Sequence, residues 1–194
     1  MRKISLLLLV LLVLLVLLSA SLQGCFPVVA GGVATGVTMV QDRRTSGTFL
    51  EDQTIEFKAG DLVGKQFHDT VHVNATSYNR SVLLSGEVPN ETVKADIGKL
   101  VFGIENVRNV NNELIVAGLS SLTSRSSDGL ITSNVKIGFV RDERLTAEHV
   151  KVVTENGTVF LMGLVTRAEA DAATGIASST SGVQRVVKLF EYLD

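Results

Sequence analysis

Hydrophobic and polar positions follow the same order in two parts of the chain, about 77 residues apart. Apolar residues alternate with polar ones over much of 71–88 and 150–165, and an Ala- and acid-rich stretch follows each copy. A glycine then opens a third run of strand-forming residues, at 103–110 and at 182–189. An internal period of this size indicates a duplicated module of roughly 70 residues rather than one larger domain.

The spacing of the apolar positions distinguishes strands from helices within each copy. Alternation over 150–154 and again over 159–163 predicts two strands. The dipeptide Asn156-Gly157 between them is a strong hairpin signal, because both residues accept the positive φ of a type I′ turn. In the first copy, the segment 74–80 predicts a longer and less determined turn.

Helices are predicted on both sides of each strand pair. Asn90 and Thr166 are candidate N-caps for the helices that follow the strands, and 50–67 and 130–144 are helical candidates ahead of them. Each module is therefore expected to run helix, strand, strand, helix, strand. Such a unit is an α+β layer in which the helices cover one face of a three-stranded sheet.

Two segments of the second copy resemble the BON domain. They are Asn-Gly-x-Val-x-Leu-x-Gly-x-Val at 156–165 and Ser-Gly-Val-Gln-Arg-Val at 181–186. The glycines at matching strand ends, Gly86 and Gly163, permit close packing or a bend. With the lipobox motif described below, the resemblance is to dual-BON outer-membrane lipoproteins, a family without a catalytic motif. It implies a phospholipid-binding periplasmic protein that supports envelope integrity.

The repeat divides the chain into five expected parts. They are a signal peptide at 1–24, a lipidated N-terminus and flexible tether at 25–47, a first BON-like domain at 48–118, a Ser-rich linker at 119–129, and a second BON-like domain at 130–194. Because the linker is short, the two tandem modules should touch rather than tumble freely.

The first residues have the pattern of an export signal. Arg2 and Lys3 precede an uninterrupted apolar run at 6–18, which is too short and wrongly flanked for a confident transmembrane span. Leu22-Gln23-Gly24-Cys25 then resembles the bacterial lipobox. The small residue before the cysteine lets the lipoprotein signal peptidase reach the bond.

The lipobox resemblance implies a diacylglyceryl thioether on Cys25 and an acylated N-terminus, with no other cofactor. Cys25 is the only cysteine of the chain, so no intramolecular disulfide competes for it. Phe26 follows it in place of Asp, which by resemblance to known sorting rules favours the outer membrane. The expected location is the periplasmic face of a Gram-negative outer membrane.

Composition excludes several other classes of protein. The chain has 18 basic and 20 acidic residues, and the signal peptide carries two of the basic ones and no acid. The mature part thus has a net charge of about −4, so it lacks the excess of basic residues expected of a nucleic-acid-binding protein. We find no phosphate-binding glycine loop and no nucleophile elbow, so the sequence does not indicate an enzyme.

The three histidines, His68, His72 and His149, are the remaining candidates for metal chemistry. His68 and His72 are spaced i, i+4, which brings side chains together on a helix but not on the strand predicted here. We therefore expect solvated histidines at strand edges, and no metal site.

The predicted helix at 130–144 carries two apolar stripes. One is spaced i, i+4, i+8 and should face the sheet: Ile131, Val135 and Phe139. The other lies on roughly the opposite side and is rimmed by basic residues: Leu130, Ile137 and Val140, with Lys136, Arg141 and Arg144. An apolar stripe with a basic rim is typical of a helix at an anionic bilayer surface. The alternative is that this stripe packs against the first module.

The two predicted sheets also differ on the face that points away from the helices. In the second module this face is apolar, with Val153, Phe160 and Met162. In the first module it is mostly polar, with His72, Asn74, Ser81, Leu83 and Ser85. The apolar set needs a cover, and the first module is the nearest candidate. If it provides that cover, the helix stripe is free for lipid.

Two functions follow from these patterns. The first is binding of anionic phospholipids, such as phosphatidylglycerol or cardiolipin, at the outer membrane. The second is a protein-interaction adaptor for outer-membrane assembly or division (septal) machinery, for which the same stripe would be a docking site. Binding to anionic lipid should weaken with salt, whereas protein docking should not.

Overall fold

The computed structural model describes residues 42–194, which all lie in one compact unit, Thr38–Asp194. The signal peptide, the lipobox with Cys25 and most of the expected tether lie outside the described residues. Among the helices of the described part, none combines the length and the apolarity needed to cross a bilayer.

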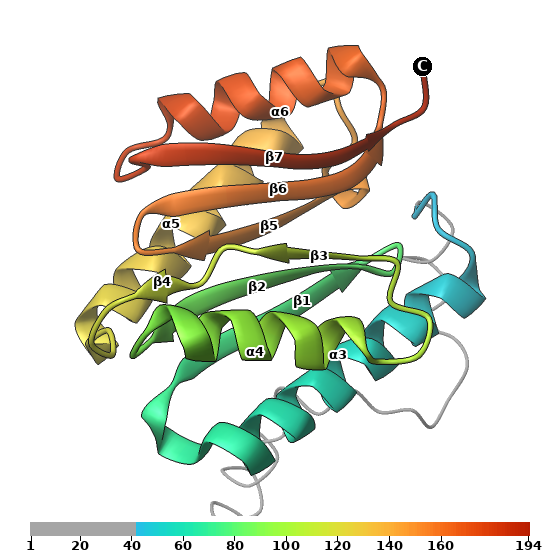
Figure 1. The fold of residues 1–194 in the computed structure, drawn as a ribbon. Helices are drawn as coiled ribbons and strands as arrows, with labels where there is room; N and C mark the ends of the chain where they lie inside the picture. The colour runs from blue at the N-terminus through green and yellow to red at the C-terminus, as the bar shows by residue number, and fades with distance from the viewer. Residues whose placement is uncertain (1–41) are drawn as a thin grey trace, which may run out of the picture. The chain divides into compact units, whose positions relative to one another are not determined.

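The elements of the two modules follow the predicted order (Figure 1). The first module contains α3 (Ser46–Phe67), the 3-10 turn η1 (His68–Thr70), β1 (His72–Tyr78), β2 (Ser81–Val88), α4 (Glu91–Phe102), β3 (Asn109–Asn112) and β4 (Ile115–Val116). The second contains α5 (Leu122–Arg141), η2 (Ala147–His149), β5 (Val150–Glu155), β6 (Thr158–Val165), α6 (Arg167–Ser179) and β7 (Arg185–Tyr192). The predicted α+β fold of two tandem modules is confirmed.

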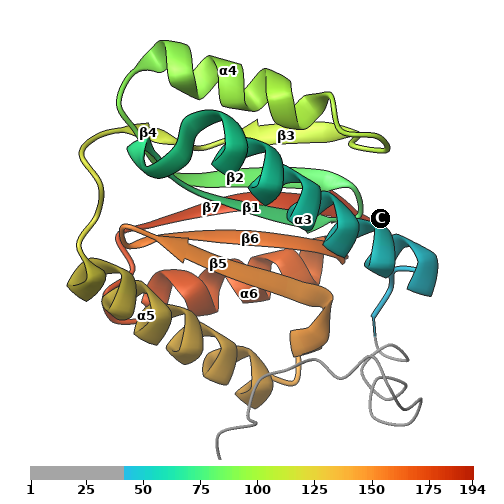
Figure 2. The ribbon, with the colours of Figure 1, turned by 90° about the horizontal axis from the view of Figure 1, so that it is seen from below.

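Each sheet combines a hairpin with a parallel third strand. β1 and β2 are antiparallel, and β3 and the short β4 both pair parallel with β2. β5 and β6 are antiparallel, and β7 pairs parallel with β6. The helices of each module cover one face of its sheet, as Figures 1 and 2 show. The parallel third strand follows from the crossover through α4 or α6.

Both hairpins turn through two residues of positive φ. Asn156 (φ 48°) and Gly157 (φ 70°) confirm the predicted turn. The longer loop expected at 74–80 is wrong, because β1 pairs with β2 as far as Tyr78 and the turn is Asn79 (φ 50°) and Arg80 (φ 65°).

A buried aspartate from the preceding helix holds each of these turns. The Asp52 carboxylate of α3 accepts the backbone N–H groups of Asn79 and Arg80, at 2.8 and 2.7 Å. The Asp128 carboxylate of α5 accepts those of Asn156 and Gly157, at 2.9 Å each. The duplication therefore extends to a long-range contact that no local pattern shows.

The predicted caps and strand glycines are confirmed. The side chain of Asn90 accepts the N–H of Val93, and Thr166 forms a capping box with Glu169. A side chain at Gly86 or Gly163 would collide with a backbone carbonyl of the neighbouring chain segment, so both strands approach too closely for any residue but glycine.

Several element boundaries differ from those predicted. The Ser121 side chain caps α5 by accepting the N–H of Ser124, so α5 begins at Leu122 and takes up most of the expected linker. The helix ends at Arg141 because Asp142 is extended, which leaves Arg144 outside it. Both third strands begin later than expected, since Asn106 (φ 67°) and Gly182 (φ 89°) form turns ahead of them.

Each module has its own core, and a third apolar cluster joins the two sheets. Leu84 and Leu161, at matching positions of β2 and β6, are fully buried under the helices. The third cluster contains Tyr78, Leu83, Phe160 and Met162, with Val153, Leu164, Val187 and Leu189 packed against it. The first module thus covers the apolar sheet face of the second, as predicted.

Candidate functional site

The outward face of α5 presents three exposed apolar side chains. The inward residues Ile131, Val135 and Phe139 are buried against the sheet, as predicted. Leu130, Ile137 and Val140 are 67%, 48% and 75% exposed, and we call these three residues the α5 apolar stripe. The stripe therefore adds little to the packing of its own module.

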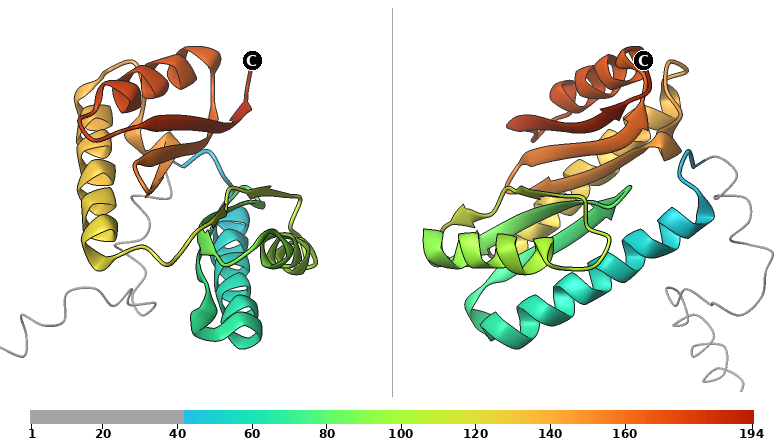
Figure 3. Two further views of the ribbon diagram at one scale, coloured as in Figure 1. Left: turned by 60° about the vertical axis from the view of Figure 1, so that its left-hand side comes forward. Right: turned by 45° about the vertical axis from the view of Figure 1, so that its right-hand side comes forward.

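The first module does not cover the α5 apolar stripe. The modules meet through their sheet faces, and α5 lies on the other side of the second sheet, as Figures 2 and 3 show. The interpretation that the stripe packs against the first module is therefore wrong. The physical reason is that the outward sheet residues, with Phe160 and Met162 at the centre, already fill that contact.

The basic residues around the stripe differ in whether an acidic side chain pairs with them. Lys136 and Arg141 are exposed, and neither forms an ion pair among residues 42–194. Arg144 lies beyond the helix end and pairs with Asp142 at 2.6 Å. The guanidinium of Arg144 lowers the pKa of Asp142 to about 2, so the pair stays ionised. Lys136 and Arg141 consequently carry the free positive charge of this surface.

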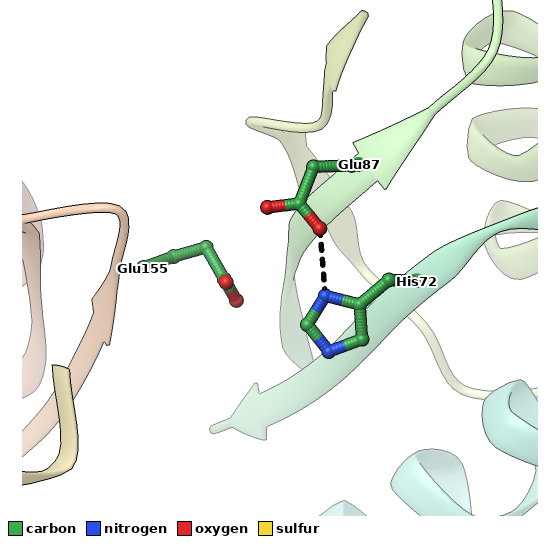
Figure 4. A group of neighbouring side chains, drawn as sticks. All are labelled: His72, Glu87 and Glu155. Atoms are coloured by element: carbon green, nitrogen blue, oxygen red, sulfur yellow. Dashed lines mark hydrogen bonds and ion pairs between the residues drawn. The ribbon is translucent and has the colours of Figure 1, made fainter. Parts of the chain in front are cut away.

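A polar cluster lies between the two sheets and is drawn in Figure 4. His72 and Glu87 are cross-strand neighbours in the first sheet, with Nδ1 and Oε2 2.8 Å apart. Glu155 reaches them from the end of β5, and the three side chains form what we call the interface cluster. Glu87 is 1% exposed and Glu155 is 7% exposed.

The interface cluster corrects the expectation that all three histidines are solvated at strand edges. His68 is exposed, but His72 is largely covered, and the half-buried His149 lies 3.3 Å from Glu169. The pairing of His72 with Glu87 does not follow from the turn expected at 74–80, because that turn starts several residues too early. The correct register would have placed His72 opposite Glu87.

The pKa values of the two buried glutamates are shifted in opposite directions. Burial raises the pKa of Glu155, and the neighbouring carboxylates of Glu87 and Asp128 add to that effect. Burial also disfavours charge on Glu87, but hydrogen bonds from Asn156, His72 and Ser120 outweigh it and lower its pKa. Glu87 is thus held as a carboxylate, while Glu155 is the group of the cluster that most favours a proton or another cation.

The residues just before α3 join the two modules. The Arg43 guanidinium pairs with Glu169 of the second module at 2.8 Å. Arg44 pairs with Asp52 of the first module at 2.7 Å and stacks over the Tyr78 ring. The last part of the expected tether is therefore fixed to both modules.

Comparison with known proteins agrees with the duplicated architecture. The model of the BON domain matches residues 51–118 and 127–194. The chain is 46% identical over 175 residues to the outer membrane lipoprotein DolP of Haemophilus influenzae, covering 89% of this chain and 91% of that protein. It is 32% identical over 154 residues to the 21 kDa hemolysin of Actinobacillus pleuropneumoniae, covering 78% and 79%. It is 31% identical over 144 residues to the osmotically-inducible protein Y of Escherichia coli, covering 72% of each.

Proposed function

The chain belongs to the BON-domain family, and from this premise we propose that it is a lipid-anchored outer-membrane lipoprotein whose second module binds anionic phospholipid. The family assignment agrees with the expectation that the chain is not an enzyme. The outer-membrane location is supported by the name of the Haemophilus influenzae relative, which matches most of the chain. In this proposal Cys25 carries the lipid anchor.

The exposure of the α5 apolar stripe is the observation that carries the lipid-binding proposal. Three large apolar side chains gather on one helix face, and about half or more of each is exposed to solvent. Burying such a face in the boundary between headgroups and acyl chains removes its apolar surface from water. Lys136 and Arg141 stand beside it, and each adds about 1 kcal/mol of attraction near an anionic surface.

A lipid anchor makes this weak surface effective. Acyl chains on Cys25 hold the protein at the bilayer, so α5 meets headgroups at a high local concentration. A helix face that binds free vesicles only moderately then suffices to orient the protein on the membrane. Envelope support would follow from this membrane-bound state.

Vesicle flotation of the mature, unlipidated Cys25→Ala protein, which lacks residues 1–24, tests the proposal. We expect it to float with phosphatidylglycerol- or cardiolipin-containing vesicles, to stay behind with phosphatidylcholine alone, and to release as salt rises. Ile137→Glu should abolish flotation while leaving the unfolding midpoint near that of the parent, because Ile137 is 48% exposed.

Phe57→Glu is the matched control for Ile137→Glu. Phe57 is 77% exposed on α3, the equivalent helix of the first module, so the same charge enters an apolar position outside the proposed site. This variant should float like the parent. Unchanged flotation of folded Ile137→Glu protein would refute the lipid role of α5 and leave a protein-docking function for the stripe.

A further inference from the structure

We propose that the interface cluster, His72, Glu87 and Glu155, binds a divalent transition-metal ion of the zinc class and links the two modules through it. The proposal rests on the sheet interface and not on the lipid-binding surface. His72 and Glu87 come from the first module and Glu155 from the second. A bound ion would therefore be coordinated by both modules at once.

The geometry of the cluster fits a small cation. One ligand atom of each side chain lies within 4.8 Å of the other two. Zinc ligands at about 2.0–2.2 Å from the metal are separated from one another by roughly 3.3 Å. To reach this spacing, the Glu155 carboxylate would move closer by up to about 1.5 Å, and the hydrogen-bonded His72 Nδ1 and Glu87 Oε2, now 2.8 Å apart, would separate by about 0.5 Å.

The donor set selects the class of metal. One imidazole nitrogen and two carboxylate oxygens suit zinc and its neighbours among the first-row transition metals. Calcium and magnesium prefer sites made only of oxygen ligands. Three protein ligands leave one position of a tetrahedral ion for water.

Burial and charge give an independent reason for a cation. The carboxylates of Glu87 and Glu155 are almost fully buried, and neither forms an ion pair with a lysine or arginine of the described part of the chain. Glu155 Oε2 accepts hydrogen bonds from Asn74 at 3.0 Å and Ser85 at 3.4 Å, and no described residue donates to its other oxygen. Buried carboxylates in such surroundings are stabilised by a coordinated metal.

The cluster is reachable, and its ligands are held in place. A cavity of about 340 Å³ leads to it and is lined by His72, Asn74, Arg125, Asp128, Thr132 and Glu155, among others. Asn156 Nδ2 donates to Glu87 Oε1 at 2.7 Å, and Asn74 donates to Glu155. Such outer hydrogen bonds are the usual means of orienting metal ligands.

Metal-dependent thermal unfolding of the tag-free protein, first stripped with a chelator, tests the site. At zinc concentrations well above the dissociation constant we expect the unfolding temperature to rise by roughly 5 °C or more, with 1:1 binding by calorimetry. Calcium and magnesium should give no rise. No lipid is present, so the result is separate from that of vesicle flotation.

His72→Gln and Glu155→Gln should each abolish the zinc effect, and two variants keep the test decisive if one fails to fold. His68→Gln is the matched control, because His68 is an exposed histidine next to the same strand and its loss should leave the zinc effect intact. If zinc does not raise the unfolding temperature of the parent protein, the proposal is overturned. An equal rise in the folded His72→Gln and Glu155→Gln variants would also overturn it and identify adventitious surface binding.

Discussion

The helices α3 and α5 hold equivalent places in the two modules, yet they are alike only on the side that faces inward. Each buries an apolar stripe against its own sheet, and each supplies a buried aspartate, Asp52 or Asp128, to a hairpin turn. These shared contacts define the fold. Loss of such a core or turn contact destabilises the module.

The outward sides of the same helices differ. On α3 the exposed Leu50 and Phe57 share the surface with Lys58 and with an Asp61–Lys65 ion pair, so acidic and basic residues are mixed there. On α5 the exposed apolar residues stand beside Lys136 and Arg141, which have no acidic partner among the described residues. The two modules therefore share the contacts that form the fold and differ on the helix surfaces that face solvent.

The largest expected effect is the loss in free energy of unfolding when one of the two turn-holding aspartates is removed. Asp52→Ala should cost about 3–5 kcal/mol, because it removes a partner of the buried Arg44 as well as of the Asn79 and Arg80 N–H groups. Asp128→Ala should cost only about 1–3 kcal/mol, since it leaves two backbone N–H groups without partners. Urea unfolding of both variants measures the difference. Equal losses would show that Arg44 contributes nothing to the first module.

Matching core positions should respond alike. Leu84→Ala and Leu161→Ala each remove a fully buried side chain at the same point of the hairpin, so each should cost about 2–5 kcal/mol. Because the chain has no tryptophan for fluorescence, chemical denaturation followed by circular dichroism gives both values. A variant that unfolds like the parent would break the equivalence of the two cores.

The two N-caps predict a difference in acid stability. Burial opposes the charge on Glu169, but hydrogen bonds from Arg43, Thr166 and His149 outweigh it and lower its pKa from 4.5 to about 2. Because the folded-state pKa is the lower one, the stabilisation is complete above pH 4.5 and disappears as the pH falls toward 2.

This acid loss should be about 3 kcal/mol between pH 5 and pH 2 and should be absent in Glu169→Gln, which is already weaker at pH 7. The first module has no counterpart, because its Asn90 cap includes no capping box. Unfolding curves between pH 5 and pH 2 test this assignment. An unchanged acid slope in Glu169→Gln would place the titrating group elsewhere.

The smallest effects separate the basic residues of the proposed lipid surface. Arg141→Gln should weaken binding to anionic vesicles about fivefold, corresponding to about 1 kcal/mol for one free cation near the surface. Arg144→Gln should weaken it by less than about twofold, because Asp142 already pairs with Arg144. Vesicle titration at low salt provides both numbers. A larger loss for Arg144 would mean that the lipid headgroup displaces Asp142.

The sequence determined the features that depend on near neighbours in the chain. The order of elements, the Asn156-Gly157 turn, the Asn90 and Thr166 caps and the two stripes of α5 all follow from residues a few positions apart. Turn chemistry, capping and periodicity are local, so they can be predicted without knowing the fold.

The features that join distant residues became apparent only in the folded molecule. The first hairpin turn depends on Asp52, which lies 27 and 28 residues before the N–H groups that it accepts. The interface cluster depends on a contact between Asn74 and Glu155, 81 residues apart. Burial of the facing sheets, and with it the exposure of the α5 apolar stripe, likewise required both modules to be in place. A local pattern shows which side chains are apolar or charged, but it does not show which distant surface will cover them.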